Sequence, residues 1–398
     1  MLVAGEASGD KHGAALAFAL RNQSAGREIE LFGCGGKEMR AAGVETVVDS
    51  LKLGIIGIPE IVRALPKFYT AYRRLVSAAN ARQADAVVLI DWPDFNLKLA
   101  RRLNREGFKI VYYISPQVWA WRKYRVRAIR RSVRRMLVIL PFEEEFYRRE
   151  GVAVEYVGHP LSGAVRVTRS REEFARVHGL DVRRPIIALL PGSRQKELYY
   201  HLPMMVEAAA RLAETPIDWA ATGSPESSLE YSDWTRSRPQ FVMPLASTVE
   251  RSEVEAMLGP APRINLIEHD VYNALGHALA AVVASGTATV EAALLGVPMV
   301  VVYKGSELNW RLIRPLIKLD TFGMANLIAG ERIVPELIQH EATPDRIVSE
   351  LVAILSDRGR LAKIKENLAL VRARLSSVGT PPSELAARRV MDIALGEP

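Results

Sequence analysis

The sequence predicts an α/β protein built from two doubly wound domains that face each other across a cleft. Short apolar runs rich in β-branched residues alternate with longer helical patterns, which is typical of a parallel sheet with helices on both faces. This alternation occurs twice, on either side of a break in periodicity at VGHPLSGAVRV (157–167). The chain has 398 residues, of which 49% are apolar, so it is too long for one ordinary core and apolar enough to form two.

The expected elements follow from the periodicity of the apolar residues. Strands are expected before the break at 1–4, 29–33, 86–90, 109–114, 136–140 and 154–157, and after it at 185–190, 217–221, 263–267, 281–284 and 298–303. Helices are expected at 11–22, 61–79, 95–106, 143–150, 198–213, 286–295 and 345–356. Residues 223–262, rich in Ser, Pro and Glu, are expected to form a surface insertion. We therefore place the domains at 1–162 and 163–359, with C-terminal helices at about 360–398 packing back on the first.

The composition excludes several classes of protein. A single cysteine, Cys34, rules out a disulfide framework and fits a reducing cytoplasm. No uninterrupted apolar run reaches the roughly 18 residues of a membrane-spanning helix, and the N-terminus lacks the basic and apolar regions of a signal peptide. The net charge of +8 suits phosphates, nucleic acid or an anionic membrane surface and does not choose among them.

The loops that follow the predicted strands carry the candidate residues, because ligands of open α/β sheets bind at the carboxyl ends of strands. In DWPDFN (91–96), Pro93 delays the next helix, so Asp91 lies at the strand end and is a candidate general base for a hydroxyl nucleophile. The alternative is an acid that binds nearby main-chain N–H groups. Asp94 is interpreted as an N-cap or first-turn acid. Glu6, in AGEASGD (4–10), is the second candidate catalytic acid.

A basic run, WRKYRVRAIRRSVRR (121–135), follows another predicted strand. Aromatic and arginine side chains together can stack on a sugar or hold a phosphate. The simpler interpretation of most of these cations is the exposed face of one helix. Arg122, the cation nearest the strand end, is the candidate for substrate binding.

Two loops of the second half predict phosphate binding. In PGSR (191–194), Ser193 and Arg194 stand at a helix N-terminus, where N–H groups and a guanidinium can clamp a diphosphate. In SGTATVE (285–291), Ser285, Gly286 and Thr287 open a further helix at a strand end.

Two polar residues accompany these loops. Glu291 can accept hydrogen bonds from both hydroxyls of a ribose, and the structural alternative is the acid of a capping box. Asn326 lies between apolar residues and is either a loop cap or a ligand contact.

The segment 53–75 combines apolar residues with cations at its edge. Such a face suits a lipid surface, and packing in the core is the alternative. The candidate membrane-facing residues are Ile55, Ile56, Ile58, Leu65 and Phe68. The sequence shows no group of histidines at metal-ligand spacing and no D-x-D pair, so no metal site is predicted.

Six motifs occur in the order found in lipid-A-disaccharide synthases, namely AGEASGD, DWPDFN, SPQVWAWR, LPFE, LLPGSR and SGTATVEAAL. The sequence resembles this family over residues 5–340. The resemblance implies a GT-B fold of two Rossmann-like domains, the first binding the acceptor and the second the UDP-sugar. It also implies an inverting, metal-independent glycosyltransferase without a cofactor. Its substrates would be UDP-2,3-diacylglucosamine and 2,3-diacylglucosamine 1-phosphate, and its products the β-1,6 lipid A disaccharide 1-phosphate and UDP.

The resemblance also implies roles for individual residues. Asp91 matches the family's candidate base, Glu6 a site residue, and Arg194 the diphosphate-binding arginine. Ser285, Thr287 and Glu291 resemble the nucleotide pocket, and Asn326 matches an asparagine of the family's site. The segment 53–75 corresponds to a membrane-facing patch, which implies peripheral attachment on the cytoplasmic side of the inner membrane. A homodimer is a further implication.

Three other functions fit parts of the sequence. A UDP-sugar epimerase on the same scaffold would need no acceptor. A nucleic-acid-binding protein would use the cations of 122–135, but neither an RNA-binding aromatic sheet motif nor a helix-turn-helix pattern is present, and we expect no nucleic-acid partner. A membrane scaffold without activity would leave the polar strand-end loops unexplained.

Overall fold

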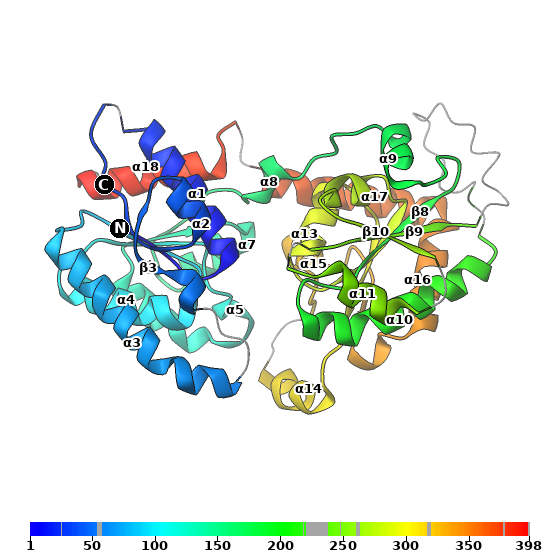
Figure 1. Ribbon diagram of the computed structural model, residues 1–398, viewed down its shortest axis with the longest axis horizontal. Helices are drawn as coiled ribbons and strands as arrows, with labels where there is room; N and C mark the ends of the chain where they lie inside the picture. Colours follow the sequence, from blue (N-terminus) through cyan, green and yellow to red (C-terminus); the bar gives the residue numbers. More distant parts are fainter. Residues whose placement is uncertain are drawn as a thin grey trace. The chain divides into compact units, whose positions relative to one another are not determined.

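The computed structural model describes residues 1–24, 26–53, 58–217, 219, 238–246, 248–259, 263–316, 320–376 and 379–396. They form two compact units, Met1–Pro160 with Leu375–Pro398, and Leu161–Arg374. Each unit is a parallel sheet flanked by helices (Figure 1), which confirms the predicted α/β class. Among the described residues, no helix has the length and apolar character needed to cross a bilayer.

The first unit contains a seven-stranded sheet in the order β3-β2-β1-β4-β5-β6-β7. Its strands are β1 (Leu2–Ala4), β2 (Phe32–Gly35), β3 (Glu45–Asp49), β4 (Val87–Ile90), β5 (Ile110–Tyr113), β6 (Arg135–Val138) and β7 (Val154–Tyr156). Its helices are α1 (Ala7–Asn22), α2 (Lys37–Ala41), α3 (Ile58–Ala81), α4 (Pro93–Arg105), α5 (Val118–Trp121), α6 (Val126–Ser132), α7 (Pro141–Arg149) and α18 (Pro382–Leu395), with 3-10 turns η1 (Ser50–Leu53) and η2 (Lys123–Arg125).

The alternation of side chains along β4 explains how this sheet is covered on both faces. Val87 and Leu89 belong to one apolar core, whereas Val88 and Ile90 belong to another. Because successive side chains of a strand point to opposite faces, a strand buried on both sides reads as an unbroken apolar run. The second core includes residues of α18, which lies beside α1 (Figure 1), so the C-terminal helix is part of this unit.

The second unit contains a six-stranded sheet in the order β10-β9-β8-β11-β12-β13. Its strands are β8 (Ile186–Leu190), β9 (Gln240–Pro244), β10 (Ile264–Ile267), β11 (Ala280–Ala284), β12 (Met299–Tyr303) and β13 (Glu336–Ile338). Its helices are α8 (Leu161–Ala164), α9 (Arg171–His178), α10 (Gln195–Glu214), α11 (Arg251–Leu258), α12 (Val271–Gly276), α13 (Thr287–Leu294), α14 (Glu307–Ile313), α15 (Met324–Ala329), α16 (Pro344–Leu355) and α17 (Arg358–Leu375), with 3-10 turns η5 (Arg314–Leu316) and η6 (Gln339–Glu341).

The structure differs from the expected elements in the second unit. The strand expected at 217–221 is wrong, because Ile217 lies outside any strand and Trp219 lies in a 3-10 turn, while the rest of that segment lies outside the described residues. The surface insertion expected at 223–262 is also wrong for its described part. Residues 240–244 form β9, which is fully buried between β8 and β10. The apolar run FVM is short, and the polar composition around it did not indicate a strand.

Three further differences concern the edges of the units. The expected strands omitted β3 and β13, which are edge strands of five and three residues. Short strands at a sheet edge carry little periodicity. The C-terminal return expected at about 360 begins at Leu375, because α17 up to Arg374 belongs to the second unit.

Candidate functional site

Asp91 stands at a sharp turn between β4 and α4. Both Asp91 (φ 47°) and Trp92 (φ 50°) adopt the left-handed conformation. For residues other than glycine this conformation costs about 1–2 kcal/mol each, so the surrounding structure must hold it. Since β1 pairs with β4 and Ala4 lies opposite Ile90, the loop with Glu6 lies beside this turn.

The main chain of Asp91 is held by three hydrogen bonds. Its N–H donates to the carbonyl of Tyr113 at 3.1 Å. Its carbonyl accepts from Asn96 Nδ2 at 2.7 Å and from the Tyr112 hydroxyl at 2.6 Å. The ring of Trp92 stacks on Phe95 with centroids 4.1 Å apart, which fixes the other half of the turn.

The loop after β1 is fitted closely to this turn. A Cβ atom on Gly5 would lie 2.0 Å from the Trp92 ring, so only glycine allows the two loops to approach. Glu6 is exposed and is the N-cap residue of α1. Burial, and after it the charge of Glu6, raises the pKa of Asp91 to about 6, although the N–H of Trp92 donates to its carboxylate. A carboxylate with this pKa is ionised at neutral pH and is a stronger base than an ordinary aspartate.

A second acid of this unit, Glu143 on α7, was not singled out from the sequence. Its side chain is 1% exposed. Its Oε1 accepts from Ser115 Oγ at 2.6 Å and from Trp119 Nε1 at 3.0 Å, and its Oε2 has no partner among the described residues. Burial raises the pKa of Glu143 to about 7, against the effect of these hydrogen bonds. The motifs SPQVWAW and LPFE therefore meet at one buried carboxyl group.

The basic run does not form one helix. It is divided among α5, η2, α6 and the start of β6, and most of its described cations are exposed, as expected. Arg122 Nη1 lies 3.2 Å from Asp94 Oδ1, and Arg125 pairs with the same carboxylate. Asp94 is therefore a first-turn acid of α4 that binds two arginines, and it is not the N-cap, which is Trp92.

In the second unit, the loop after β11 has an open approach to the N-terminus of α13. Gly286 has φ 155°, and a Cβ atom there would meet nothing within 4 Å. Gly286 and Thr287 are exposed, and the Ser285 hydroxyl donates to the carbonyl of Phe322 at 2.8 Å. The first N–H groups of a helix have no partner within it, so this terminus can bind an anion.

The loop after β8, the neighbour of β11, is held by an acid in the first turn of α10. Glu197 Oε2 accepts from the N–H of Ser193 at 2.8 Å and from that of Arg194 at 3.3 Å. The N–H of Ser193 is therefore paired within the protein in this structure, and phosphate binding at Ser193 stays a prediction. The side chain of Arg194 is 79% exposed and remains the candidate for the diphosphate.

Glu291 lies on α13, beyond its third residue, which is Thr289, so the capping-box alternative is wrong. Burial raises the pKa of Glu291 to about 7, although a hydrogen bond with Tyr272 acts in the opposite direction. Glu291 is a half-buried carboxyl group on the helix that follows the loop at Ser285, and its contact with ribose hydroxyl groups stays a prediction.

Asn326 is completely buried, and its amide is fully used within the protein. Its Nδ2 donates to Val334 O at 2.9 Å and to Glu336 Oε1 at 2.7 Å. Its Oδ1 accepts from the N–H groups of Ile333 at 2.8 Å and Val334 at 3.0 Å. These four bonds saturate the group, so the structure favours the loop-cap interpretation over a ligand contact.

His201 is a second buried polar residue that the sequence did not indicate. The N–H of Lys304, after β12, donates to its Nε2 at 3.0 Å, so Nδ1 carries the proton and donates to Pro191 O at 2.8 Å. Burial lowers the pKa of His201, in keeping with a neutral ring. It thereby joins the loop after β8 to the loop after β12.

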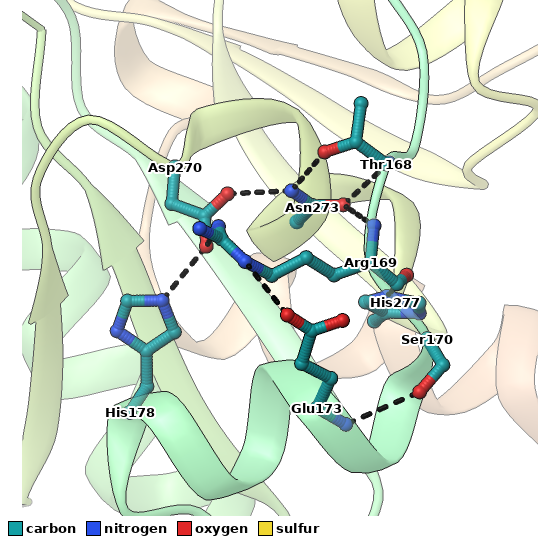
Figure 2. A network of polar contacts seen from close by, with 8 residues as sticks. All are labelled: Thr168, Arg169, Ser170, Glu173, His178, Asp270, Asn273 and His277. Atoms are coloured by element: carbon teal, nitrogen blue, oxygen red, sulfur yellow. Dashed lines mark hydrogen bonds and ion pairs between the residues drawn. The ribbon is translucent and has the colours of Figure 1, made fainter.

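Figure 2 shows the polar contacts of Asp270, which follows β10. Its carboxylate accepts from Arg169 at 2.6 Å, from His178 at 2.9 Å and from Asn273 at 2.6 Å. Asn273 Oδ1 in turn accepts from the N–H groups of Thr168 and Arg169. Asp270 is therefore occupied in tying the segment before α9 to this unit.

Of the five candidate membrane-facing residues, one has a described side chain. Phe68 is half buried and packs on the rings of Trp92 and Phe95, at 6.0 and 6.3 Å between centroids, which fits the core-packing alternative. Ile55 and Ile56 lie outside the described residues, as do the side chains of Ile58 and Leu65.

Comparison with known proteins decides the family. The family profile described as lipid-A-disaccharide synthetase matches residues 1–222 and 234–387. The lipid-A-disaccharide synthase of Koribacter versatilis is 42% identical over 399 residues, covering 99% of this chain and 98% of the relative. That of Acidobacterium capsulatum is 43% identical over 403 residues, covering 97% of this chain and 93% of the relative. The chain belongs to the lipid-A-disaccharide synthase family. It is an enzyme of the glycosyltransferase class, as the resemblance implied.

Solved structures share the fold of this lipid-A-disaccharide synthase family member. The glycotransferase of kitacinnamycin is 16% identical with a TM-score of 0.59, covering 98% of both chains. The calicheamicin glycosyltransferase CalG4 is 17% identical with a TM-score of 0.53, covering 99% of this chain and 96% of the other. The UDP-GlcNAc 2-epimerase of Neisseria meningitidis, bound to UDP-GlcNAc, is 12% identical with a TM-score of 0.55, covering 100% and 99%. At these identities the likeness shows the GT-B fold alone, so the epimerase alternative gains no support.

Proposed function

We propose that the chain joins UDP-2,3-diacylglucosamine to 2,3-diacylglucosamine 1-phosphate, giving the β-1,6 lipid A disaccharide 1-phosphate and UDP. UDP-sugar and lipid-linked acceptor substrates follow from the family. The observation that carries the detailed proposal is Asp91, a base of raised pKa held at the end of β4 in the motif DWPDFN.

In this reaction Asp91 takes the proton of the acceptor's 6-hydroxyl as its oxygen attacks the anomeric carbon of the donor. The bond from that carbon to the diphosphate oxygen breaks, and its electron pair leaves with UDP. Attack from the face opposite the leaving group inverts the anomeric centre. Glu6 contributes through its charge, because a second carboxylate nearby makes Asp91 the better proton acceptor.

The leaving UDP carries growing negative charge. The exposed guanidinium of Arg194 and the N-terminus of α13 at Ser285, Gly286 and Thr287 would stabilise this charge, which is usually a large part of such catalysis. Glu291, when ionised, would accept hydrogen bonds from the ribose. Arg122 would assist substrate binding from the end of α5, and no step of this scheme requires a metal or cofactor.

The first unit is proposed to bind the acceptor and the second the UDP-sugar. Peripheral attachment to the cytoplasmic face of the inner membrane is proposed because both substrates carry acyl chains, with residues 53–75 as the contact. A homodimer stays a prediction of the sequence resemblance.

The test is incubation of the enzyme with both lipid substrates, followed by mass spectrometry for the disaccharide. We expect disaccharide and UDP from the wild type, and a loss of about 10²–10⁴-fold in turnover with UDP affinity retained in Asp91→Asn. Near-wild-type turnover in Asp91→Asn would remove Asp91 from the mechanism. Conversion of the UDP-sugar without an acceptor would instead support the epimerase.

A further inference from the structure

We propose that Asn96 and Tyr112 are positioning residues that aim the Asp91 carboxylate by holding its main-chain carbonyl. This inference rests on the proposed role of Asp91 as the base. Neither residue would touch the substrate, and each would act through the conformation of the turn.

The contacts converge on two consecutive carbonyl groups. Asn96 Nδ2 donates to the carbonyl of Ile90 at 3.2 Å and to that of Asp91 at 2.7 Å, and the Tyr112 hydroxyl donates to Asp91 O at 2.6 Å. Asn96 comes from α4 and Tyr112 from the neighbouring strand β5, so two separate elements hold one peptide group. Fixing this peptide fixes the direction of the Cα–Cβ bond of Asp91 and hence the starting point of its carboxylate.

The turn requires such support because two successive residues with side chains are left-handed. Asp91 and Trp92 have φ values of 47° and 50°. Residues other than glycine leave this conformation unless neighbouring groups over-determine it, and such strain gathers at functional sites.

The burial of both residues shows that packing alone does not explain them. Asn96 and Tyr112 are 0% exposed. Tyr112 belongs to an apolar core, as do Phe95 and Leu97 on either side of Asn96, so an apolar side chain would suit the surroundings of either residue. Asn96 also leaves its Oδ1 buried without a partner among the described residues, which is costly. The two hydrogen bonds that Asn96 Nδ2 donates compensate for this cost, and both acceptors belong to the turn at Asp91. Burial raises the pKa of Tyr112 well above its usual value, so its hydroxyl stays a donor throughout the working pH range.

The experiment compares Tyr112→Phe and Asn96→Ala with Tyr147→Phe. The control removes a hydroxyl that is equally buried and also donates to a main-chain carbonyl, but to that of Pro116, at 3.2 Å, and not to that of Asp91. Turnover, KM for both substrates, UDP affinity and the melting temperature are measured for each variant. The two substitutions at Asn96 and Tyr112 are repeated in the Asp91→Asn background.

We expect Tyr112→Phe to lower kcat about tenfold and Asn96→Ala at least as much, with KM and UDP affinity within about twofold of wild type. Tyr147→Phe should keep kcat. In the Asp91→Asn background neither substitution should lower the residual rate further, because residues that act through one group are not additive. The carboxyl ¹³C shift of Asp91, titrated by NMR, should give a changed pKa in Tyr112→Phe and an unchanged one in Tyr147→Phe.

Equal losses in the wild-type and Asp91→Asn backgrounds would overturn the inference, as would an unchanged Asp91 titration in Tyr112→Phe. If Asn96→Ala does not fold, the Tyr112→Phe results decide alone. Full activity of Asp91→Asn would refute the base itself, and with it the inference. If turnover depends on Asp91 but is unchanged in Tyr112→Phe, the inference is refuted and the proposed function stands.

Discussion

Replacing Glu143 with glutamine should change how the stability of the protein depends on pH. The carboxyl group is 1% exposed, and its Oε2 has no hydrogen-bond partner among the described residues. Its pKa is raised from 4.5 to about 7 in the folded protein, which corresponds to about 3 kcal/mol at roughly 1.4 kcal/mol per pH unit. A group whose pKa is raised by folding favours the folded state below its unfolded pKa, and this contribution is lost as the pH rises through the folded pKa.

The wild type should therefore lose about 2–3 kcal/mol of unfolding free energy relative to Glu143→Gln between about pH 5 and pH 8. Denaturant unfolding of both proteins at a series of pH values measures this difference, in which titrating groups that do not interact with Glu143 cancel. Glu145→Gln is the matched control, because Glu145 lies on the same helix, is exposed and pairs with Arg149 at 2.7 Å. A difference between wild type and Glu143→Gln that stays constant over this range, or that changes in the opposite direction, would refute the reasoning.

Four further outcomes are expected. The value of kcat/KM should fall as the pH drops through about 6, because protonated Asp91 cannot accept a proton, and a profile flat down to pH 5 would contradict this. Arg194→Ala should weaken UDP binding about 10–100-fold by calorimetry, the usual value of a charged hydrogen bond, and unchanged affinity would exclude the guanidinium. UDP affinity should increase as the pH rises through about 7, where Glu291 ionises, and Glu291→Gln should remove this dependence. Asn326→Ala should lower the unfolding free energy by about 2–4 kcal/mol, because it leaves the N–H groups of Ile333 and Val334 without an acceptor and removes one hydrogen bond to Glu336. The folded variant should keep its UDP affinity, and a selective loss of UDP binding would restore the ligand-contact interpretation.

Several features of the protein could be predicted from the sequence because they depend on local patterns. Apolar runs such as VVLI before Asp91 indicate strands that are buried on both faces, and their alternation with helices fixes the parallel α/β class. The same logic placed Asp91, Glu6 and the loops at Arg194 and Ser285 at strand ends, where the structure has them. The strand β9 was missed because its place between β8 and β10 depends on pairing partners distant in the sequence.

The state of each polar group was decided only by the tertiary structure. Whether a carboxylate is an open site or an occupied anchor depends on which residues surround it, and those residues come from other elements. Glu197 accepts from the N–H groups of Ser193 and Arg194. Asn326 uses both polar groups of its amide within its own unit, and Glu143 is buried against Ser115 and Trp119. Hydrogen bonds and desolvation act over a few ångströms in space, whereas sequence patterns report neighbours along the chain. The sequence therefore determined which loops carry the chemistry, and the packing between elements decided which side chains in them are available for it.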